Sequence, residues 1–344
     1  MATFWAWSGH PAMIVFFVVS GVLAQHSMRG EGCLETAAQQ AKYYRKRALR
    51  LLPAYYLSVL YYLPAAIRAA SGTVLMAYLL QLTGVQSMLP GVSICGVDMI
   101  WNFNGPAWFV STLLQCIWVF PHFNRSVISQ VQTRTQALGW IALFVLLRAS
   151  LLPIKWCFDF PRPVTLGAGI DWGSRGVETW YEFAPVRWLE FLSGALLVRA
   201  MQLSDKHAFG LPGWARAGGG DLCLVAFAAL FGFGTPWYRV GALDPAYLAV
   251  TLAFIVCAAT PKGEGEGFVD GIGFGLRLLR HGAWTPLTPL MYYAYVFQDC
   301  ACSVANSLGY SNETTGGLYL TMVMFLVIVA SAVLQPAMDA VAKM

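Results

Sequence analysis

The chain has 344 residues, of which 58% are hydrophobic and only 11% are charged. This composition excludes an ordinary water-exposed surface, which needs far more charge, and so predicts an integral membrane protein. The net charge of +5, from 22 Lys and Arg against 17 Asp and Glu, is usual for the basic ends of membrane helices and gives no reason to expect nucleic acid as a partner.

Nine apolar segments are predicted to be membrane-spanning helices. In chain order they cover residues 11–26, 50–68, 105–122, 136–154, 183–200, 221–237, 243–260, 284–308 and 316–338. The stretch "GTVLMAYLLQLTGVQSML" from Gly72 is ambiguous, because its Gln, Thr and Gly residues also suit a buried, re-entrant or interfacial helix. The predicted fold class is therefore all-α, a polytopic transmembrane bundle of about nine to ten helices, in a single domain over residues 1–344.

The charges predict how such a bundle would be oriented. Most Lys and Arg residues fall on one side of the predicted topology, in 27–49, 123–135, 201–220, 261–283 and the C-terminus. The positive-inside rule makes that side cytoplasmic. The glycosylation sequon at Asn312 falls in a loop on the opposite side, which agrees. We expect a multi-pass membrane protein with cytoplasmic basic loops, and the organelle is left open.

The cysteines give no sign of a metal or redox site. There are eight of them, and no CxxC pair occurs. Zinc and dithiol motifs need close, paired thiols. No metal cofactor is therefore expected.

A cationic run stands directly before one apolar segment. The stretch "YYRKRALRLLPAYYLSVLYYL" from Tyr43 contains Arg45, Lys46, Arg47 and Arg50. Arg47 and Arg50 are three positions apart, so they share one face of a helix. Two interpretations stay open: an anchor to the phosphates of a lipid bilayer, or a fork of guanidinium groups for a phosphorylated ligand such as coenzyme A.

Five segments in fixed order carry a family resemblance. They are "FFVVSGVL" from Phe16, "RALRLLPAYY" from Arg47, "NGPAWFVSTLLQCIWVFP" from Asn104, "PVRWLEFLSGALL" from Pro185 and "PLMYYAYVFQ" from Pro289. In order and spacing the chain resembles the acyltransferase 3 family of multispanning membrane O-acyltransferases, over nearly its whole length from Phe16. The resemblance implies transfer of an acyl group, commonly acetyl, from cytoplasmic acyl-CoA to a hydroxyl of a carbohydrate, lipid or small-molecule acceptor.

The resemblance also implies roles for particular residues. Acetyl-CoA, or another acyl-CoA, would be the co-substrate, and the acceptor would be a glycan or lipid hydroxyl. The residues implied by the family pattern are Arg45, Arg47 and Arg50 for binding the acyl donor, Ser20 and Gly21 for a close helix approach beside it, and Trp108 and Ser111 for lining the substrate cavity. In the expected mechanism the acceptor hydroxyl attacks the thioester directly.

The chain departs from the family at its ionisable groups. The family opens with a further helix that carries a histidine general base, and the residues before Phe16 leave no room for it. His26 is the histidine nearest the Arg run and is the candidate base, because an imidazole suits proton transfer near neutral pH. An intramembrane carboxylate is replaced at Leu113, and a late histidine is replaced by Gln298.

These departures leave the enzyme assignment open. An incomplete N-terminus would explain the missing helix and the odd number of spans, and a degenerate enzyme would explain the missing ionisable groups. The alternatives to an active acyltransferase are a catalytically inactive acyltransferase-like protein with a binding or regulatory role, or a transporter, although transporters often show internal repeats and none is found here.

Overall fold

The computed structural model describes residues 2–28, 34, 36–69, 71–89, 92–100, 103–158, 164–165, 170–172, 183–203, 213–233, 243–259, 287–309, 322–326, 328–329, 332–333 and 336. The chain divides into two compact units. Unit 1 comprises Met1–Gln40, Trp118–Pro161 and Val177–His281, and unit 2 comprises Ala41–Ile117, Arg162–Gly176 and Gly282–Met344.

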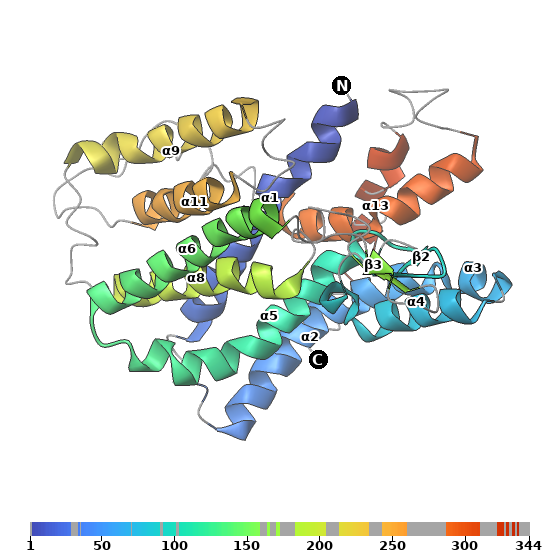
Figure 1. The fold of residues 1–344 in the computed structure, drawn as a ribbon, viewed down its shortest axis with the longest axis horizontal. Coiled ribbons are helices and arrows are strands. Elements are labelled where there is room, and N and C mark those ends of the chain that lie inside the picture. Colours follow the sequence, from blue (N-terminus) through green and yellow to red (C-terminus); the bar gives the residue numbers. More distant parts are fainter. Residues whose placement is uncertain are drawn as a thin grey trace. The chain divides into compact units, whose positions relative to one another are not determined.

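Unit 1 is built from packed helices. They are α1 (Ala2–Ser27), α6 (Arg134–Phe158), α8 (Ala184–Gln202), α9 (Gly213–Phe233) and α11 (Asp244–Ala259). Helix α8 packs against both α1 and α6, and α11 contacts α1, α6, α8 and α9. In Figure 1, α9 and α11 run side by side. Helix α8 is the most deeply buried, because nearly every residue from Glu190 to Ala200 is inaccessible to solvent.

Unit 2 combines helices with a small sheet. Its helices are most of α2 (Ala37–Leu60), α3 (Leu63–Arg68), α4 (Gly72–Thr83), the first part of α5 (Ala107–Ser126) and α13 (Leu287–Ser307). A short 3₁₀ turn, η2 (Gln86–Met88), follows α4. The segment around Gly72 therefore forms a helix, which ends at Gly84 in the left-handed conformation that glycine adopts without strain.

Four short antiparallel strands form a sheet in the order β2-β1-β4-β3. They are β1 (Ser93–Ile94), β2 (Val97–Asp98), β3 (Val164–Thr165) and β4 (Ile170–Trp172). Cys95 and Gly96 join β1 to β2 with positive φ angles of 51° and 79°, as a two-residue type I′ hairpin requires. The sheet was not predicted from the sequence, because strands this short show no alternating pattern.

Local capping explains where two of the helices begin. Thr36 and Gln39 form a capping box at the start of α2, in which Gln39 N donates to Thr36 Oγ1 (3.2 Å) and Thr36 N donates to Gln39 Oε1 (3.1 Å). Thr133 and Gln136 repeat this arrangement before α6. Because α2 begins this early, the cationic run lies inside the helix and not directly before it, as predicted from the sequence.

The predicted helical segments up to residue 308 each overlap a helix of the structure. The last segment, 316–338, lies largely outside the described residues. The polytopic transmembrane bundle is nevertheless wrong, because among the described residues no helix is both long and apolar enough to cross a bilayer. Helix α11 has 16 residues, about 24 Å against about 30 Å of hydrocarbon, and the apolar part of α8 contains Arg187 and Glu190.

The predicted localisation is corrected with the fold class. The assignment of basic loops to the cytoplasm relied on nine spans that alternate across a membrane. In the part of the chain that the structure describes, no helix meets the requirement for such a span. The prediction of an integral multi-pass membrane protein is therefore wrong.

Two glycines allow α1 and α8 to cross closely. A Cβ atom added at Gly21 would overlap the carbonyl oxygen of Phe191, and one added at Gly194 would overlap the carbonyl oxygen of Val18. Both obstacles are backbone atoms, which cannot rotate away as a side chain would. Gly21 thus lies at a close helix crossing, and its partner helix is α8.

Replacement of either glycine by alanine is expected to destabilise unit 1. Gly21→Ala and Gly194→Ala should each lower the free energy of unfolding by about 1–3 kcal/mol, because the helices must separate. Gly139 is the control, since it lies exposed inside α6 with no atom within 4 Å of an added Cβ; Gly139→Ala should raise stability by about 0.5–1 kcal/mol. Denaturant unfolding measures all three, and equal effects would contradict this account of the crossing.

Candidate functional site

Helix α2 carries a cationic face in unit 2. The side chains of Lys42, Arg45, Lys46 and Arg50 are exposed, and Arg47 is half-buried. The helix contains no Asp or Glu. Like charges three and four positions apart on a helix repel one another and create a region of positive potential. The arrangement therefore favours an anionic ligand.

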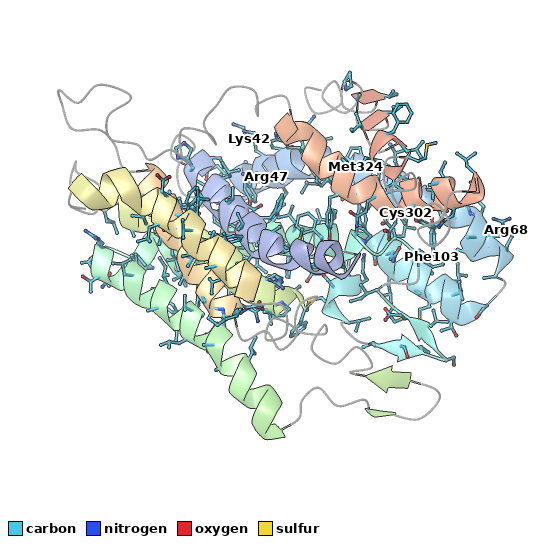
Figure 2. All side chains as sticks on the ribbon, turned by 90° about the horizontal axis from the view of Figure 1, so that it is seen from above. Lys42, Arg47, Arg68, Phe103, Cys302 and Met324 are labelled. Atoms are coloured by element: carbon cyan, nitrogen blue, oxygen red, sulfur yellow. The ribbon has the colours of Figure 1, made fainter. Side chains whose placement is uncertain are left out.

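One member of this face is held by an aromatic ring. The guanidinium carbon of Arg47 lies 5.6 Å from the centroid of the Tyr43 ring, within the range of a cation–π contact. Tyr43 is buried, and burial raises the pKa of its phenol above the ordinary value, so the ring stays neutral. Figure 2 shows Lys42 and Arg47 on α2, well separated from Arg68 on α3.

A buried polar cluster joins several elements of unit 2 around Asn104. The Asn104 side chain is fully buried, and its Nδ2 donates to Ser58 Oγ of α2 (2.9 Å) and to the Val296 carbonyl of α13 (3.3 Å). The backbone N of Asn104 donates to Gln81 Oε1 of α4 (3.4 Å). Gln81 Nε2 in turn donates to the Ile100 carbonyl (2.8 Å). These bonds fix the entry into α5 against three helices.

Asp299 lies beside this cluster. Its Oδ2 accepts a hydrogen bond from Gly105 N (2.9 Å), the residue next to Asn104. The side chain is half-buried, and burial raises the pKa of the Asp299 carboxyl, although the Gly105 N–H acts in the opposite direction. A carboxylate with a raised pKa is a stronger base than an ordinary aspartate.

Cys300 and Tyr62 border Asp299 in their neutral forms. Cys300 Sγ contacts the Ser58 carbonyl at 3.7 Å, and burial raises the pKa of its thiol to about 12. Burial is also the main cause that raises the pKa of Tyr62, and the nearby Cys300 and Asp299 add to it. A cysteine is a good nucleophile only as the thiolate, and not as the thiol. Cys300 is therefore a poor candidate for carrying an acyl group.

The two residues expected to line a substrate cavity are engaged inside unit 2. Trp108 is 1% exposed. The Ser111 hydroxyl is buried, donates to the Gly84 carbonyl (2.7 Å) and lies 2.8 Å from Ser87 Oγ. Gln115 Nε2 extends this group by donating to Ser87 Oγ (2.8 Å). Ser111 thus joins Gly84 and Ser87 of the α4–η2 segment to α5, and its role in substrate binding stays a prediction.

Unit 1 contains a separate group of buried charges. Arg187 of α8 is fully buried, and its Nη1 donates to both oxygens of Glu190 (2.6 and 2.9 Å). Arg148 of α6 bonds to Glu190 through Nε (3.4 Å) and to Asp244 of α11 through Nη2. Two cations and two carboxylates balance in charge, so this network joins three helices with no net buried charge.

The remaining predicted residues lie in unit 1. Ser20 is half-buried, Gly21 occupies the crossing with α8, and His26 is exposed in the last turn of α1. Arg45, Arg47 and Arg50 belong to unit 2. The roles of Ser20 and Gly21 beside the acyl donor, and of His26 as a base, stay predictions.

The group around Asp299 and Asn104 was not predicted from the sequence. One signal was present, because Asp299 is the only acidic residue in the apolar segment 284–308 and follows Gln298, where the family pattern has an ionisable group. Asn104 was read only as the start of a motif. Within the described residues, no set of three or more His, Cys, Asp or Glu side chains is placed to share a metal ion.

Comparison with known proteins gives no family assignment. No protein-family model, no curated protein and no solved structure matches this chain. The features that bear on function are therefore the cationic face of α2, the polar cluster of unit 2 and the sequence motifs that resemble those of acyltransferase 3 proteins.

Glu190→Gln is expected to destabilise unit 1 strongly. The change leaves Arg187 and Arg148 buried beside a neutral amide, and an uncompensated buried charge costs about 3–5 kcal/mol. The double variant Arg187→Met/Glu190→Met removes a cation together with the carboxylate and leaves Arg148 bonded to Asp244. Denaturant unfolding should show the double variant closer to wild type than Glu190→Gln. A double variant no more stable than Glu190→Gln would show that the pair does not act as one unit.

Proposed function

We propose that this protein transfers an acyl group from acyl-CoA to a hydroxyl group of an acceptor, and that α2 binds the phosphates of the donor. The observation that supports this most directly is the cationic face of α2, with five Lys and Arg residues between Lys42 and Arg50 and no carboxylate in the same helix. The order of the five motifs that resemble acyltransferase 3 proteins supports the same function.

The type of cation favours a phosphate ligand. Guanidinium groups match phosphate oxygens bidentately, and Arg45, Arg47 and Arg50 supply three of them within two turns. The contact with Tyr43 limits the orientations open to Arg47, which reduces the entropy lost when a ligand is bound. Acyl-CoA carries phosphates at one end and its thioester at the other.

The geometry of α2 suits a ligand of that form. Ser58 lies eleven positions after Arg47, which corresponds to about 16 Å along the helix and a rotation of about 20° beyond three full turns. The two residues are therefore on nearly the same side of α2. Because Ser58 belongs to the polar cluster around Asn104, phosphates at Arg47 would leave the arm of the donor to extend toward that cluster.

A second candidate is an acyl-CoA-binding protein without turnover. The cationic face would bind coenzyme A equally well in that protein, and the late histidine of the family pattern is replaced by Gln298. Measurement of binding and of CoA release on the same preparation separates the two candidates.

The double change Arg47→Ala/Arg50→Ala is expected to weaken acetyl-CoA binding at least about tenfold. Hydrogen bonds to charged groups each contribute about 1.5–3 kcal/mol, and 1.4 kcal/mol corresponds to a factor of ten. Isothermal titration calorimetry with acetyl-CoA measures the affinity. Dephospho-CoA, which lacks the 3′-phosphate, reports whether that phosphate contributes.

Arg68→Ala is the matched control for this experiment. Arg68 is an exposed arginine of unit 2 whose Nε donates to the Pro64 carbonyl of its own helix (3.2 Å), and it lies away from the cationic face in Figure 2. Its replacement should leave the affinity unchanged. Equal affinity of the double variant and wild type would exclude α2 as the phosphate site.

A further inference from the structure

We propose that Asp299 is the catalytic base that removes the proton of the acceptor hydroxyl, and that Asn104 binds a second hydroxyl of the same acceptor. This inference rests on the acyl transfer proposed above. It assigns the base to α13 in unit 2, and not to His26, the candidate from the sequence. It also assigns the acceptor to the class of polyhydroxylated compounds.

The carboxylate of Asp299 has one oxygen held and one available. Oδ2 accepts the hydrogen bond from Gly105 N, which fixes the position of the group. In the described part of the chain Oδ1 makes no hydrogen bond, and the side chain keeps partial access to solvent. A substrate hydroxyl can therefore reach a carboxylate oxygen whose orientation is already set, which is what efficient proton transfer requires.

Asn104 adds an acceptor atom that no described residue satisfies. Its Oδ1 is buried and has no hydrogen-bond partner. Exchanging the nitrogen and oxygen of the amide would not solve this, because the atom at 3.3 Å from the Val296 carbonyl must be a donor. A buried carbonyl oxygen without a partner costs free energy, and such atoms in proteins are generally satisfied by water or by a ligand.

The carboxylate of Asp299 and the amide oxygen of Asn104 lie on two segments of the chain that bond to each other. Asn104 and Gly105 are consecutive, and they bond to Val296 and Asp299, which are three positions apart on one face of α13. A helical side chain leans toward the N-terminus of its helix, so the Asp299 carboxyl leans toward the turn that contains Val296. Two acceptor groups on segments that bond to each other fit two donor groups of one ligand, as a polyol provides.

A purely structural role for Asp299 explains fewer of the observed contacts than a role as the catalytic base does. A carboxylate near the start of α5 that only stabilised the helix would account for the Gly105 hydrogen bond. It would not account for the buried, unsatisfied oxygen of Asn104 on the preceding residue. Burial also raises the pKa of Asp299, which moves the carboxylate toward the basicity that proton abstraction needs.

The proposed reaction balances without any further reactant. The acceptor O–H gives its proton to the Asp299 carboxylate while the oxygen bonds to the thioester carbonyl carbon. The C–S bond then breaks, the electron pair leaves with the CoA sulfur, and the sulfur takes the proton from Asp299. The products are the ester and the free CoA thiol. Cys300 takes no part, because its thiol, with a pKa of about 12, stays protonated.

Asp299→Asn is the variant that tests this inference. The asparagine oxygen can still accept the Gly105 N–H, so the local structure is kept, whereas an amide cannot take up a proton as the carboxylate does. With acetyl-CoA as donor and glycerol as acceptor, CoA release should fall by about 100-fold or more. Acetyl-CoA affinity measured by calorimetry should stay at the wild-type value.

The pH dependence gives a readout that a structural role would not change. In wild type, CoA release should increase with pH through the raised pKa of Asp299, as the carboxyl loses its proton; Tyr62 and Cys300, which border it, stay neutral in that range. The residual activity of Asp299→Asn should lack this step. Cys300→Ala is the control for an acyl-cysteine intermediate and should keep the wild-type rate.

The acceptor class is tested with wild-type protein alone. Glycerol presents adjacent hydroxyls and 1-propanol presents one, so glycerol should be the better acceptor by about tenfold or more if two donors are recognised. Equal rates with both alcohols would reject the role of Asn104.

The possible outcomes separate this inference from the proposed function. Wild-type protein that binds acetyl-CoA but releases no CoA with either alcohol would overturn the acyl transfer, and the role of Asp299 with it. Wild-type turnover with an equally active Asp299→Asn variant would overturn only the assignment of the base. Loss of turnover in both Asp299→Asn and Cys300→Ala would indicate a covalent route and would also reject direct attack.

Discussion

The structure of unit 2 depends on the need to satisfy a buried asparagine. The Asn104 side chain is completely inaccessible to solvent, and a buried amide without partners would cost several kcal/mol. Its bonds to Ser58 and Val296, and the bond of its backbone to Gln81, make α2, α13 and α4 meet at one residue. The geometry of the candidate site in this unit depends on that junction. Asn104 leads into α5 and places the next residue, Gly105, against Asp299.

Unit 1 uses different interactions for the same purpose. Close backbone contact at Gly21 and Gly194 sets the spacing of α1 and α8. On α8, Glu190 binds both Arg187 and Arg148, and Arg148 continues to Asp244. Such a network orients α6, α8 and α11 relative to one another, since a displaced helix would leave a buried charge without its partner. The charges that interrupt the apolar pattern of these helices are thus part of their packing.

The acyl transfer proposed for unit 2 depends on how charged and uncharged residues are distributed along α2. Its first half carries the exposed cations, whereas Ala54, Ser58 and Val59 in its second half are buried against other elements. A long ligand with an anionic end and an uncharged reactive end matches this division. The neutral state of Cys300 and the raised pKa of Asp299 have one physical cause, which is the removal of both groups from water by the surrounding helices.

The sequence by itself determined most of the helices, because apolar periodicity acts within a few residues. The capping box of Thr36 with Gln39 at the start of α2 is equally local, but the predicted segment began at residue 50. It also indicated the cationic run of α2. Only the tertiary structure decided that Gly105 meets Asp299, that Arg148 pairs with Asp244, and that none of the described helices meets the requirements of a membrane span. The physical reason is that burial and pairing depend on contacts between residues far apart in the chain. Overall composition, in turn, does not show how long each helix is or where its charges lie.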